Sequence, residues 1–396
     1  MAIDQYLQKN PDDVVVTCAL RTPLCKARKG AFKDATYDEL LLATFEAAKE
    51  NIGVKPEQID DICVGTVTTP NGPNTARVAA LKAGFPNTVP IQVINRFCSS
   101  GLMACSVIAN QIRNKEIDIG LAVGYDNLTF AGGKSFDFSP EIMSNQECVD
   151  CTKPMGWTAE NVAGDFNISR EQMDAWAAKS HQAAAKADAE GIFKDEIAPV
   201  RVPRVVDGER KTVIVDRDDG IRQGTTKESL AKVRPAFPQW KPGQTTGGNA
   251  SQITDGGAFV LMMTRRKAEE LGLPILLKHV ATVQSGLAPR IMGIGPSIAI
   301  PLLYKRLDIK QSDIDMFEIN EAFASMMVYC VDKLNLPWDK VNVNGGAIAL
   351  GHPFGCTGAR QVATGYNALK RAGGKTLVTS MCIGSGMGAA ALWIRE

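Results

Sequence analysis

The chain has 396 residues, of which 45% are hydrophobic and 22% charged, and its formal net charge is +1. This length suffices for two or three ordinary domains, and the balanced charge excludes a molecule-wide field that would attract nucleic acid. No apolar run approaches the ~20 residues of a membrane-spanning helix. The ten cysteines are spread too thinly for a disulfide framework. We therefore expect reduced thiols, no nucleic-acid partner and no membrane span.

No targeting signal is visible at either end. The first residues lack the basic and apolar regions of a secretory signal, and the terminal Arg395-Glu396 does not match a peroxisomal Ser-Lys-Leu address. One Cys-x-x-Cys pair, Cys148 and Cys151, has no second pair and no nearby His, so we expect no metal site there. A reactive dithiol and two surface-loop thiols remain equal alternatives for this pair.

The first part of the chain alternates between expected strands and helices, which is typical of an α/β protein with a buried sheet. Apolar runs predict strands at 14–17, 62–67, 91–94 and 117–124, and helical spacing predicts helices at 36–50, 75–83 and 102–112. Thr36, with Glu39 three residues later, predicts a capping box at the start of the first helix.

Cys98 lies between the strand at 91–94 and the helix at 102–112, and Ser99 or Ser100 is the expected cap of that helix. The positive end of a helix favours a thiolate, so this turn suits an exposed nucleophile. A buried core cysteine is the alternative, because free Cys packs as a small hydrophobe.

The pattern changes between residues 130 and 244, where apolar runs are few and Lys, Asp, Gln, Pro and Gly are common. One clear helix is expected there, from Ser169 to Glu190, with Gln172 completing a capping box. We interpret this region as a large insertion that carries substrate-binding loops.

An internal repeat follows at an offset of about 255 residues. Residues 60–65 correspond to 313–319, the Cys98 turn and helix correspond to 341–369, and 119–124 correspond to 377–381. Two α/β halves of one design, the first with an insertion, are the simplest account. A pseudo-twofold axis would then place Cys98 near the Gly351-His352-Pro353 turn.

His352 is the one histidine of three that lies among glycines, since His181 is expected on a surface helix and His279 in a strand. A structural histidine in a tight turn is the alternative to a catalytic role. Next to a thiol, an imidazole is the usual acid or base near neutral pH.

Two further segments carry candidate chemistry. The glycine-rich loop from 380 to 388 starts no clear helix and has no acidic partner, which disfavours a dinucleotide loop. It presents a second thiol, Cys382, and free amides such as that of Gly384, which suit an oxyanion hole. Asn320 is a candidate polar donor into the same cleft, whereas Glu321 reads as a carboxylate at a helix start.

These segments together resemble the four sequence motifs of the thiolase family, in order and spacing, from about Asp12 onward. The inserted region resembles the peroxisomal 3-ketoacyl-CoA thiolase branch more than the acetoacetyl-CoA branch. The motifs are Asn95-x-x-Cys98-Ser-Ser-Gly101, Asn320-Glu-Ala-Phe323, the run Gly345 to Arg360 around His352, Cys382-x-Gly384-x-Gly386-x-Gly388, the run Pro154 to Ala163, Arg234 to Phe237, Gly248 to Ser251 and Met292 to Pro296.

The resemblance implies a five-layered α/β core made of two pseudo-symmetric halves. It implies an N-terminal half from residues 1–129 and 245–272, an inserted CoA-binding loop domain at 130–244, and a C-terminal half at 273–396. It also implies a homodimer or a dimer of dimers, formed through the helix and strand after Cys98. The implied location is the peroxisome, with the cytoplasm as the alternative.

The implied activity is thiolytic cleavage of 3-ketoacyl-CoA by CoA to acetyl-CoA and a shortened acyl-CoA, as in fatty-acid β-oxidation. Cys98 is the implied nucleophile, His352 accepts its proton, and Cys382 is the second acid and base. Asn320 would position a water, and the amides of Cys98 and Gly384 would hold an oxyanion. CoA is a substrate, and no cofactor or metal is implied. The implied contacts to CoA and its acyl chain are Ser251, Arg222, Met155 and Met292.

Three residues depart from the family pattern: Phe97 stands where near relatives usually have Gln, Phe354 replaces Leu or Ile, and Trp157 is bulky for its place. Chain-length preference is therefore open. An acetoacetyl-CoA thiolase that condenses two acetyl units is an alternative function. A ketoacyl synthase would lack Cys382, and a non-catalytic acyl-CoA- or lipid-binding homologue need not keep all four motifs.

Overall fold

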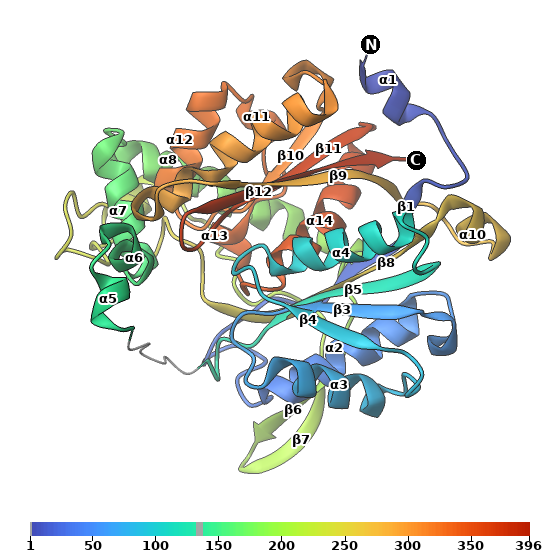
Figure 1. Ribbon diagram of the computed structural model, residues 1–396. Helices are drawn as coiled ribbons and strands as arrows, with labels where there is room; N and C mark the ends of the chain where they lie inside the picture. Colours follow the sequence, from blue (N-terminus) through green and yellow to red (C-terminus); the bar gives the residue numbers. More distant parts are fainter. Residues whose placement is uncertain (1, 132–137) are drawn as a thin grey trace.

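The computed structural model describes residues 2–131 and 138–396. Its elements stack in five layers, with a sheet on either side of two central helices and further helices outside each sheet (Figure 1). This confirms the expected α/β architecture. None of the helices in the described ranges is long and apolar enough to cross a membrane.

The outer layer beside the first half contains α2 and α3, the central layer α4 and α14, and the opposite outer layer α11 and α12. The bounds in layer order are α2 Tyr37–Asn51 and α3 Gly72–Ala83; β1 Val14–Arg21, β8 Thr254–Thr264, β5 Ile119–Asp126, β3 Asp61–Gly65, β4 Ile91–Ile94 and the short β2 Cys25–Lys26; α4 Ser100–Arg113 and α14 Thr357–Arg371; β9 Leu277–Gly286, β12 Met387–Arg395, β11 Thr376–Ile383 and β10 Met316–Ile319; α11 Gly295–Leu307 and α12 Ala324–Leu334. Two further helices lie at the periphery, α1 Ala2–Leu7 and α10 Arg265–Glu270, and the short α13 Ala347–Leu350 is buried inside the molecule.

The two halves share one strand order. The first runs β4-β3-β5-β8-β1 and the second β10-β11-β12-β9, and they join where Val15 and Val16 of β1 pair with Lys278 and Leu277 of β9. Beside β10, the parallel bridge from Phe317 to Val341 occupies the place that β4 has beside β3. The order therefore matches the internal repeat.

Strand β5 shows how the layers fit together. Its large side chains, such as Leu121 and Val123, belong to the hydrophobic cluster on the α2 and α3 side, whereas Ala122 belongs to the central cluster. Gly120 and Gly124 alternate with the large residues, so they share the face of Ala122. A Cβ on Gly120 would lie 2.5 Å from Ile108 of α4, so small residues here let the central helices approach the sheet.

The inserted region holds more structure than its one predicted helix. That helix is α8, whose start has the expected capping box, since Ser169 N donates to Gln172 Oε1 (2.9 Å) and Gln172 N to Ser169 Oγ (3.2 Å). The α7 helix and the β6–β7 hairpin were not predicted. The division into a loop domain at 130–244 between two halves remains our proposal. The elements are α5 Pro140–Met143, α6 Gln146–Cys151, α7 Met155–Asp165, α8 Arg170–Ala189, β6 Val200–Val206, β7 Glu209–Val215 and α9 Lys227–Ala231.

Two details of the sequence prediction are wrong. The strand after the Cys98 helix, β5, pairs with β3 and β8 on its two sides and is buried throughout, so it offers no edge for a dimer. The edge strand of this half is β4. His181 is not on a surface, since it is 1% exposed and its Nε2 lies 3.1 Å from the carbonyl oxygen of Gly248.

Candidate active site

Cys98 ends a tight turn between β4 and α4. Phe97 adopts a left-handed conformation (φ 46°), which is strained for a bulky residue. Ser100 Oγ donates to Phe97 O (2.7 Å) and accepts from Arg96 N (2.9 Å), while Ser99 Oγ donates to Arg96 O (2.9 Å). The two hydroxyls therefore hold the turn and do not cap the helix, contrary to the sequence prediction. The turn leaves Cys98 half-buried.

The Cys98 thiol is neutral at physiological pH. Burial raises its pKa to about 11, and the carboxylate of Asp126 acts in the same direction. The backbone amides of Gly384 and of Cys98 itself oppose this by lowering the pKa. Desolvation thus outweighs the helix terminus, and the expected thiolate is not the resting form.

His352 lies in the turn between α13 and α14, with its side chain fixed at both ring nitrogens. Nδ1 is 2.5 Å from Thr357 Oγ1, which lies 3.2 Å from Pro353 O, and Nε2 is 3.3 Å from Asn320 Nδ2. Since the Thr357 hydroxyl donates to the Pro353 carbonyl, it accepts from Nδ1–H. Nε2 then carries the lone pair, which the Asn320 amide also requires.

His352 is 3% exposed, and burial lowers its pKa to about 3, with the Arg360 guanidinium acting in the same direction. The imidazole is therefore uncharged at physiological pH. Asn320 is fully buried, and its Oδ1 has no hydrogen-bond partner among the described residues. That free acceptor beside Nε2 fits a bound water, because a buried carbonyl oxygen without a partner is costly.

Close packing of two helix starts brings these turns together. A Cβ on Gly101 would lie 2.5 Å from Gly355 O, and a Cβ on Gly358 would lie 2.2 Å from Leu102 N. The buried carboxylate of Asp126, at the end of β5, fastens the contact by accepting from Gly355 N (2.6 Å). The Cys98 and His352 turns therefore face one region, as the repeat predicts.

Cys382 lies near the end of β11, just before the Gly384 loop. Its pKa is well above the ordinary value, mainly through burial and next through the neighbouring Cys98 and Cys330. Its Sγ lies 3.4 Å from Met326 Sδ in an apolar pocket. The loop needs glycine at 386, where φ is 85° and a Cβ would lie 2.2 Å from Leu287 O. This turn aims the Gly384 amide at the Cys98 sulfur.

The four predicted ligand contacts differ in position. Ser251 is half-buried, in the loop whose next residue, Gln252, accepts from His352 N (3.0 Å). Arg222 is exposed, and Met155 is half-buried at the start of α7. Met292 is 1% exposed and shares a hydrophobic cluster with Cys382. All four remain predictions, and Arg222 has no described contact with the clustered residues.

Sequence reasoning missed Thr357, Asp126 and Gln252, which fix the His352 turn. The position of Asp126 could have indicated a functional role, because it lies at the end of a strand, where functional groups often gather in parallel sheets. The Glu321 carboxylate has a structural role, since it accepts hydrogen bonds from the side chains of Trp176, Ser180 and Asn342.

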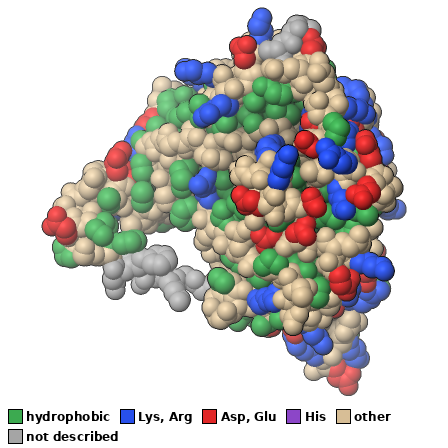
Figure 2. All heavy atoms as spheres, turned by 45° about the vertical axis from the view of Figure 1, so that its right-hand side comes forward, with side chains coloured by type: hydrophobic (Ala, Val, Ile, Leu, Met, Phe, Trp, Pro, Cys, Tyr) green, Lys and Arg blue, Asp and Glu red, His purple; other side chains and the backbone are tan. Residues whose placement is uncertain are grey.

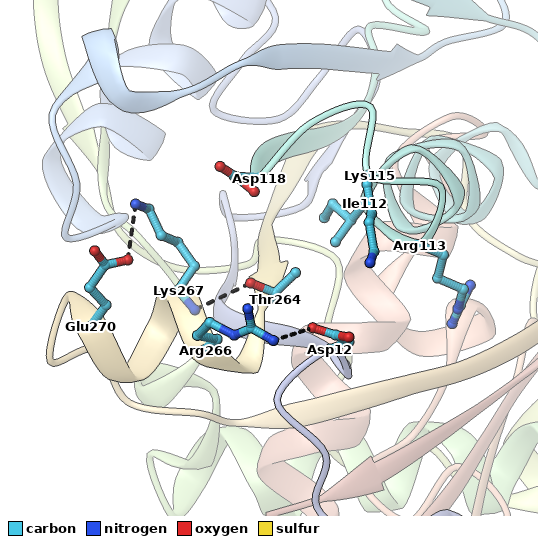
Figure 3. Close-up of a pocket in the computed structure, with 9 residues that line it drawn as sticks. All are labelled: Asp12, Ile112, Arg113, Lys115, Asp118, Thr264, Arg266, Lys267 and Glu270. Atoms are coloured by element: carbon cyan, nitrogen blue, oxygen red, sulfur yellow. Dashed lines mark hydrogen bonds and ion pairs between the residues drawn. The ribbon is translucent and has the colours of Figure 1, made fainter.

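A separate cavity of about 280 Å³ lies between the end of α4 and α10 (Figure 3). Three of its four cations are engaged: Arg266 pairs with Asp12 (2.8 Å), Lys267 pairs with Glu270 (3.1 Å), and Arg113 bonds to His279 O (2.6 Å), whereas Lys115 has no ion pair or side-chain hydrogen bond among the described residues. Among the described residues that line it there is no Cys, Ser or His. Within the described ranges, no group of three His, Cys, Asp or Glu residues is arranged to hold a metal ion.

Comparisons with known proteins agree with this geometry. Residues 14–266 match the family described as "Thiolase, N-terminal domain", and residues 273–395 match "Thiolase, C-terminal domain". The chain is 51% identical over 394 residues to the peroxisomal 3-ketoacyl-CoA thiolase B of Rattus norvegicus, covering 98% of this chain and 92% of that protein. The human peroxisomal 3-ketoacyl-CoA thiolase is 50% identical over 392 residues, with the same coverage of both proteins.

Among solved structures, the dimeric peroxisomal thiolase of Saccharomyces cerevisiae matches with a TM-score of 0.93 and 44% identity, covering 99% of this chain and 100% of that chain.

The neutral state of Cys98 can be tested by alkylation. Because its pKa is raised to about 11, the thiolate fraction should grow about tenfold per pH unit between roughly pH 7 and 9. The rate of iodoacetamide labelling at Cys98, followed by peptide mass spectrometry, should rise in parallel. A rate that levels off above about pH 7 would instead mean a stabilised thiolate. Cys98→Ala identifies the relevant peptide.

Thr357 is a positioning residue for the His352 ring, and comparing its Val and Ser variants tests the role of its hydroxyl group. In Thr357→Val the Nδ1–H of His352 loses its acceptor, and kcat should fall roughly 10²-fold, the scale of a mispositioned acid or base. KM should change little. Thr357→Ser keeps the hydroxyl and should restore most of kcat. Equal losses in both variants, or a loss confined to KM, would contradict a positioning role.

Proposed function

The chain belongs to the thiolase family, and from this premise we propose that it cleaves 3-ketoacyl-CoA with CoA, giving acetyl-CoA and a shortened acyl-CoA. Two observations support this proposal. The Gly384 amide and Cys382 lie near Cys98. Asn320 lies beside His352, whose turn packs against the turn of Cys98. An acyltransferase of this kind needs a nucleophile, a base beside it, a second acid and an oxyanion site, and these residues supply each part.

In the first half-reaction, the Cys98 sulfur attacks the C3 ketone and its proton passes to His352 Nε2. The C2–C3 bond then breaks, the acyl group stays on Cys98 as a thioester, and the electron pair leaves as the acetyl-CoA enolate. The Cys382 thiol protonates C2 of that enolate. Acetyl-CoA is released, leaving Cys382 as a thiolate.

In the second half-reaction, the Cys382 thiolate takes the thiol proton of an incoming CoA. The CoA sulfur attacks the thioester carbonyl, and the tetrahedral intermediate collapses with Cys98 as the leaving group. His352 returns the proton to Cys98. All groups end in their starting protonation states, so the cycle is closed without any cofactor.

The two pKa values show why proton transfer must accompany carbon–sulfur bond formation. With Cys98 near 11 and His352 near 3, a free thiolate–imidazolium pair would lie on the order of 10 kcal/mol above the neutral pair, before their mutual attraction. Stabilisation of the developing oxyanion offsets part of this free-energy difference. The Cys98 and Gly384 amides already point at the sulfur, and each such donor stabilises the transition state by ~3 kcal/mol.

The same reasoning assigns the enolate step. Once protonated, His352 Nε2–H donates to the thioester oxygen of the enolate. Asn320 lies beside Nε2, and its unpartnered Oδ1 would hold the water that donates to the same oxygen. Ser251 and Arg222 would bind the pantetheine arm and adenine of CoA, and Met155 and Met292 would border the acyl chain.

Location and assembly follow from the relatives, which are named peroxisomal and, for the yeast structure, dimeric. We assign this chain to fatty-acid β-oxidation in the peroxisome as a homodimer. The unpaired edge of β4 suits such an interface, because the nearby α3 exposes two apolar residues, Val78 at 57% and Leu81 at 40%.

Turnover of acetoacetyl-CoA with free CoA tests the function, followed through loss of the enolate absorbance. The wild-type chain should be active, and Cys98→Ala should lower kcat by at least about 10³-fold because it removes the nucleophile. Cys148→Ala, outside the site, should leave the rate unchanged. An inactive wild type, or full activity in Cys98→Ala, would refute the proposal.

Two aromatic rings border the reacting groups. A Cβ on Gly384 would lie 3.6 Å from the Phe97 ring, and the Phe354 ring lies 5.2 Å from that of His352. A methylene in such a pocket is worth ~1–3 kcal/mol, so the rings can set chain-length preference.

We expect kcat/KM to fall steeply from short to long 3-ketoacyl-CoA substrates. Phe97→Gln with Phe354→Leu should flatten that decline while turnover of the shortest substrate persists. The measurement is a chain-length series on both proteins, and identical profiles would show that the rings point away from the acyl chain.

A further inference from the structure

A second cavity, of about 360 Å³, opens where the β6–β7 hairpin meets the loop after β2. Three cations line it: Lys29 from that loop, Arg204 from β6 and Arg217 just after β7. None of the reacting groups belongs to this cavity. Figure 2 shows Lys and Arg side chains gathered with acidic ones on the lower projection of the molecule, where Figure 1 places the hairpin.

The side chains of these three cations have no interaction partners among the described residues. Among the described residues, no ion pair or side-chain hydrogen bond is made by Lys29, Arg204 or Arg217. The cavity of Figure 3 is of similar size and also mixes charges, but there Arg266 and Lys267 are each paired with a carboxylate. Unpaired cations around one cavity create a positive potential that attracts an anion.

The fold imposes this grouping. Arg204 shares a strand face with the buried Val200 and Val202, so its side chain is directed toward the body of the protein. Directly opposite on β7 stands Lys211. Lys211 pairs with Glu209 (3.0 Å), whereas Arg204 has no carboxylate partner among the described residues.

The two carboxylates of the lining offset the three cations only in part. Asp219 accepts from the amides of Lys26 (2.7 Å) and Ala31 (2.8 Å) and is therefore engaged by the backbone. Gly30 permits this, since a Cβ there would lie 2.3 Å from Asp219 Oδ2. With Asp216 and Asp219 against three cations, the lining keeps a formal net charge of +1.

The cavity connects to the reacting groups through one short segment. Gly220 packs against the end of α13, just before the His352 turn, because a Cβ there would lie 3.3 Å from the carbonyl oxygens of Ala349 and Leu350. Arg217 and Arg222 are five residues apart, at most ~18 Å of extended chain. We therefore place the phosphates of a nucleotide held at Arg222 along this short segment, toward Arg217.

We propose that the cavity of Lys29, Arg204 and Arg217 binds a phosphoryl group. The guanidinium forks of the two arginines match phosphate oxygens, and the lysine adds a point charge. The phosphoryl group comes from CoA, through its 3′-phosphate or diphosphate, or from free phosphate. The first source rests on the proposed function, whereas the second does not.

The test uses the full-length protein, the double variant Arg204→Gln/Arg217→Gln and the control Arg201→Gln. Arg201 lies on the same strand, pairs with Glu50 (3.2 Å) and lines a different cavity. Each exposed charge contact is worth roughly a two- to fivefold change, so the double variant should weaken phosphoryl binding by about tenfold. Circular dichroism confirms folding of all three proteins.

One arm measures KM for CoA and for 3′-dephospho-CoA, and the other measures binding of inorganic phosphate by calorimetry with and without saturating CoA. If CoA is the source, the double variant raises KM for CoA about tenfold, and CoA displaces phosphate. If free phosphate is the source, KM stays constant and phosphate still binds wild type alongside CoA.

An unchanged double variant in both arms, or an equal effect in Arg201→Gln, overturns the proposal. Phosphate binding is measurable even in a protein that fails to cleave 3-ketoacyl-CoA, so the two proposals can fail separately.

Discussion

The contact between the starts of α4 and α14 is the constraint on which the rest of the structure depends. Gly101 and Gly358 let the two backbones touch, and Asp126 fastens the Gly355 amide beside them. This approach brings the turn that carries Cys98, from one half, against the turn that carries His352, from the other. An added methyl group here would meet backbone atoms at 2.2–2.5 Å, and overpacking of that kind costs ~1–3 kcal/mol.

Burial gives this pair its chemical character. The same desolvation that makes Cys98 a weak acid makes His352 a weak base, so the resting site holds two neutral groups. A neutral thiol is less open to oxidation than a thiolate. Charge separates only when substrate brings an oxyanion to the Cys98 and Gly384 amides. Thr357 keeps the lone pair on Nε2, so the imidazole waits in the tautomer that can accept a proton.

Strand–helix alternation predicted the α/β class and the matching segments predicted the repeat, because both are local signals, whereas the five layers were implied by the resemblance to thiolases. The adjacency of the Cys98 and His352 turns followed from the repeat alone. Other features depend on tertiary contacts. The charge state of Cys98 is set by burial, and a helix-terminus argument gave it wrongly. His181 was assigned to the surface because its helix is rich in polar residues, whereas Gly248 and its loop cover it. Asp126 accepts from the distant Gly355 amide, and Thr357 bonds the His352 ring within its own turn, so neither role follows from a spacing rule.

The covalent intermediate is the central claim, and mapping it is the most direct test. The protein is incubated with a 3-ketoacyl-CoA in the absence of free CoA, quenched in acid and digested for peptide mass spectrometry. The account predicts an acyl group on the peptide that contains Cys98, its loss when CoA is added before the quench, and no adduct in Cys98→Ala. An adduct on Cys382 alone, or one that persists in Cys98→Ala, would contradict it.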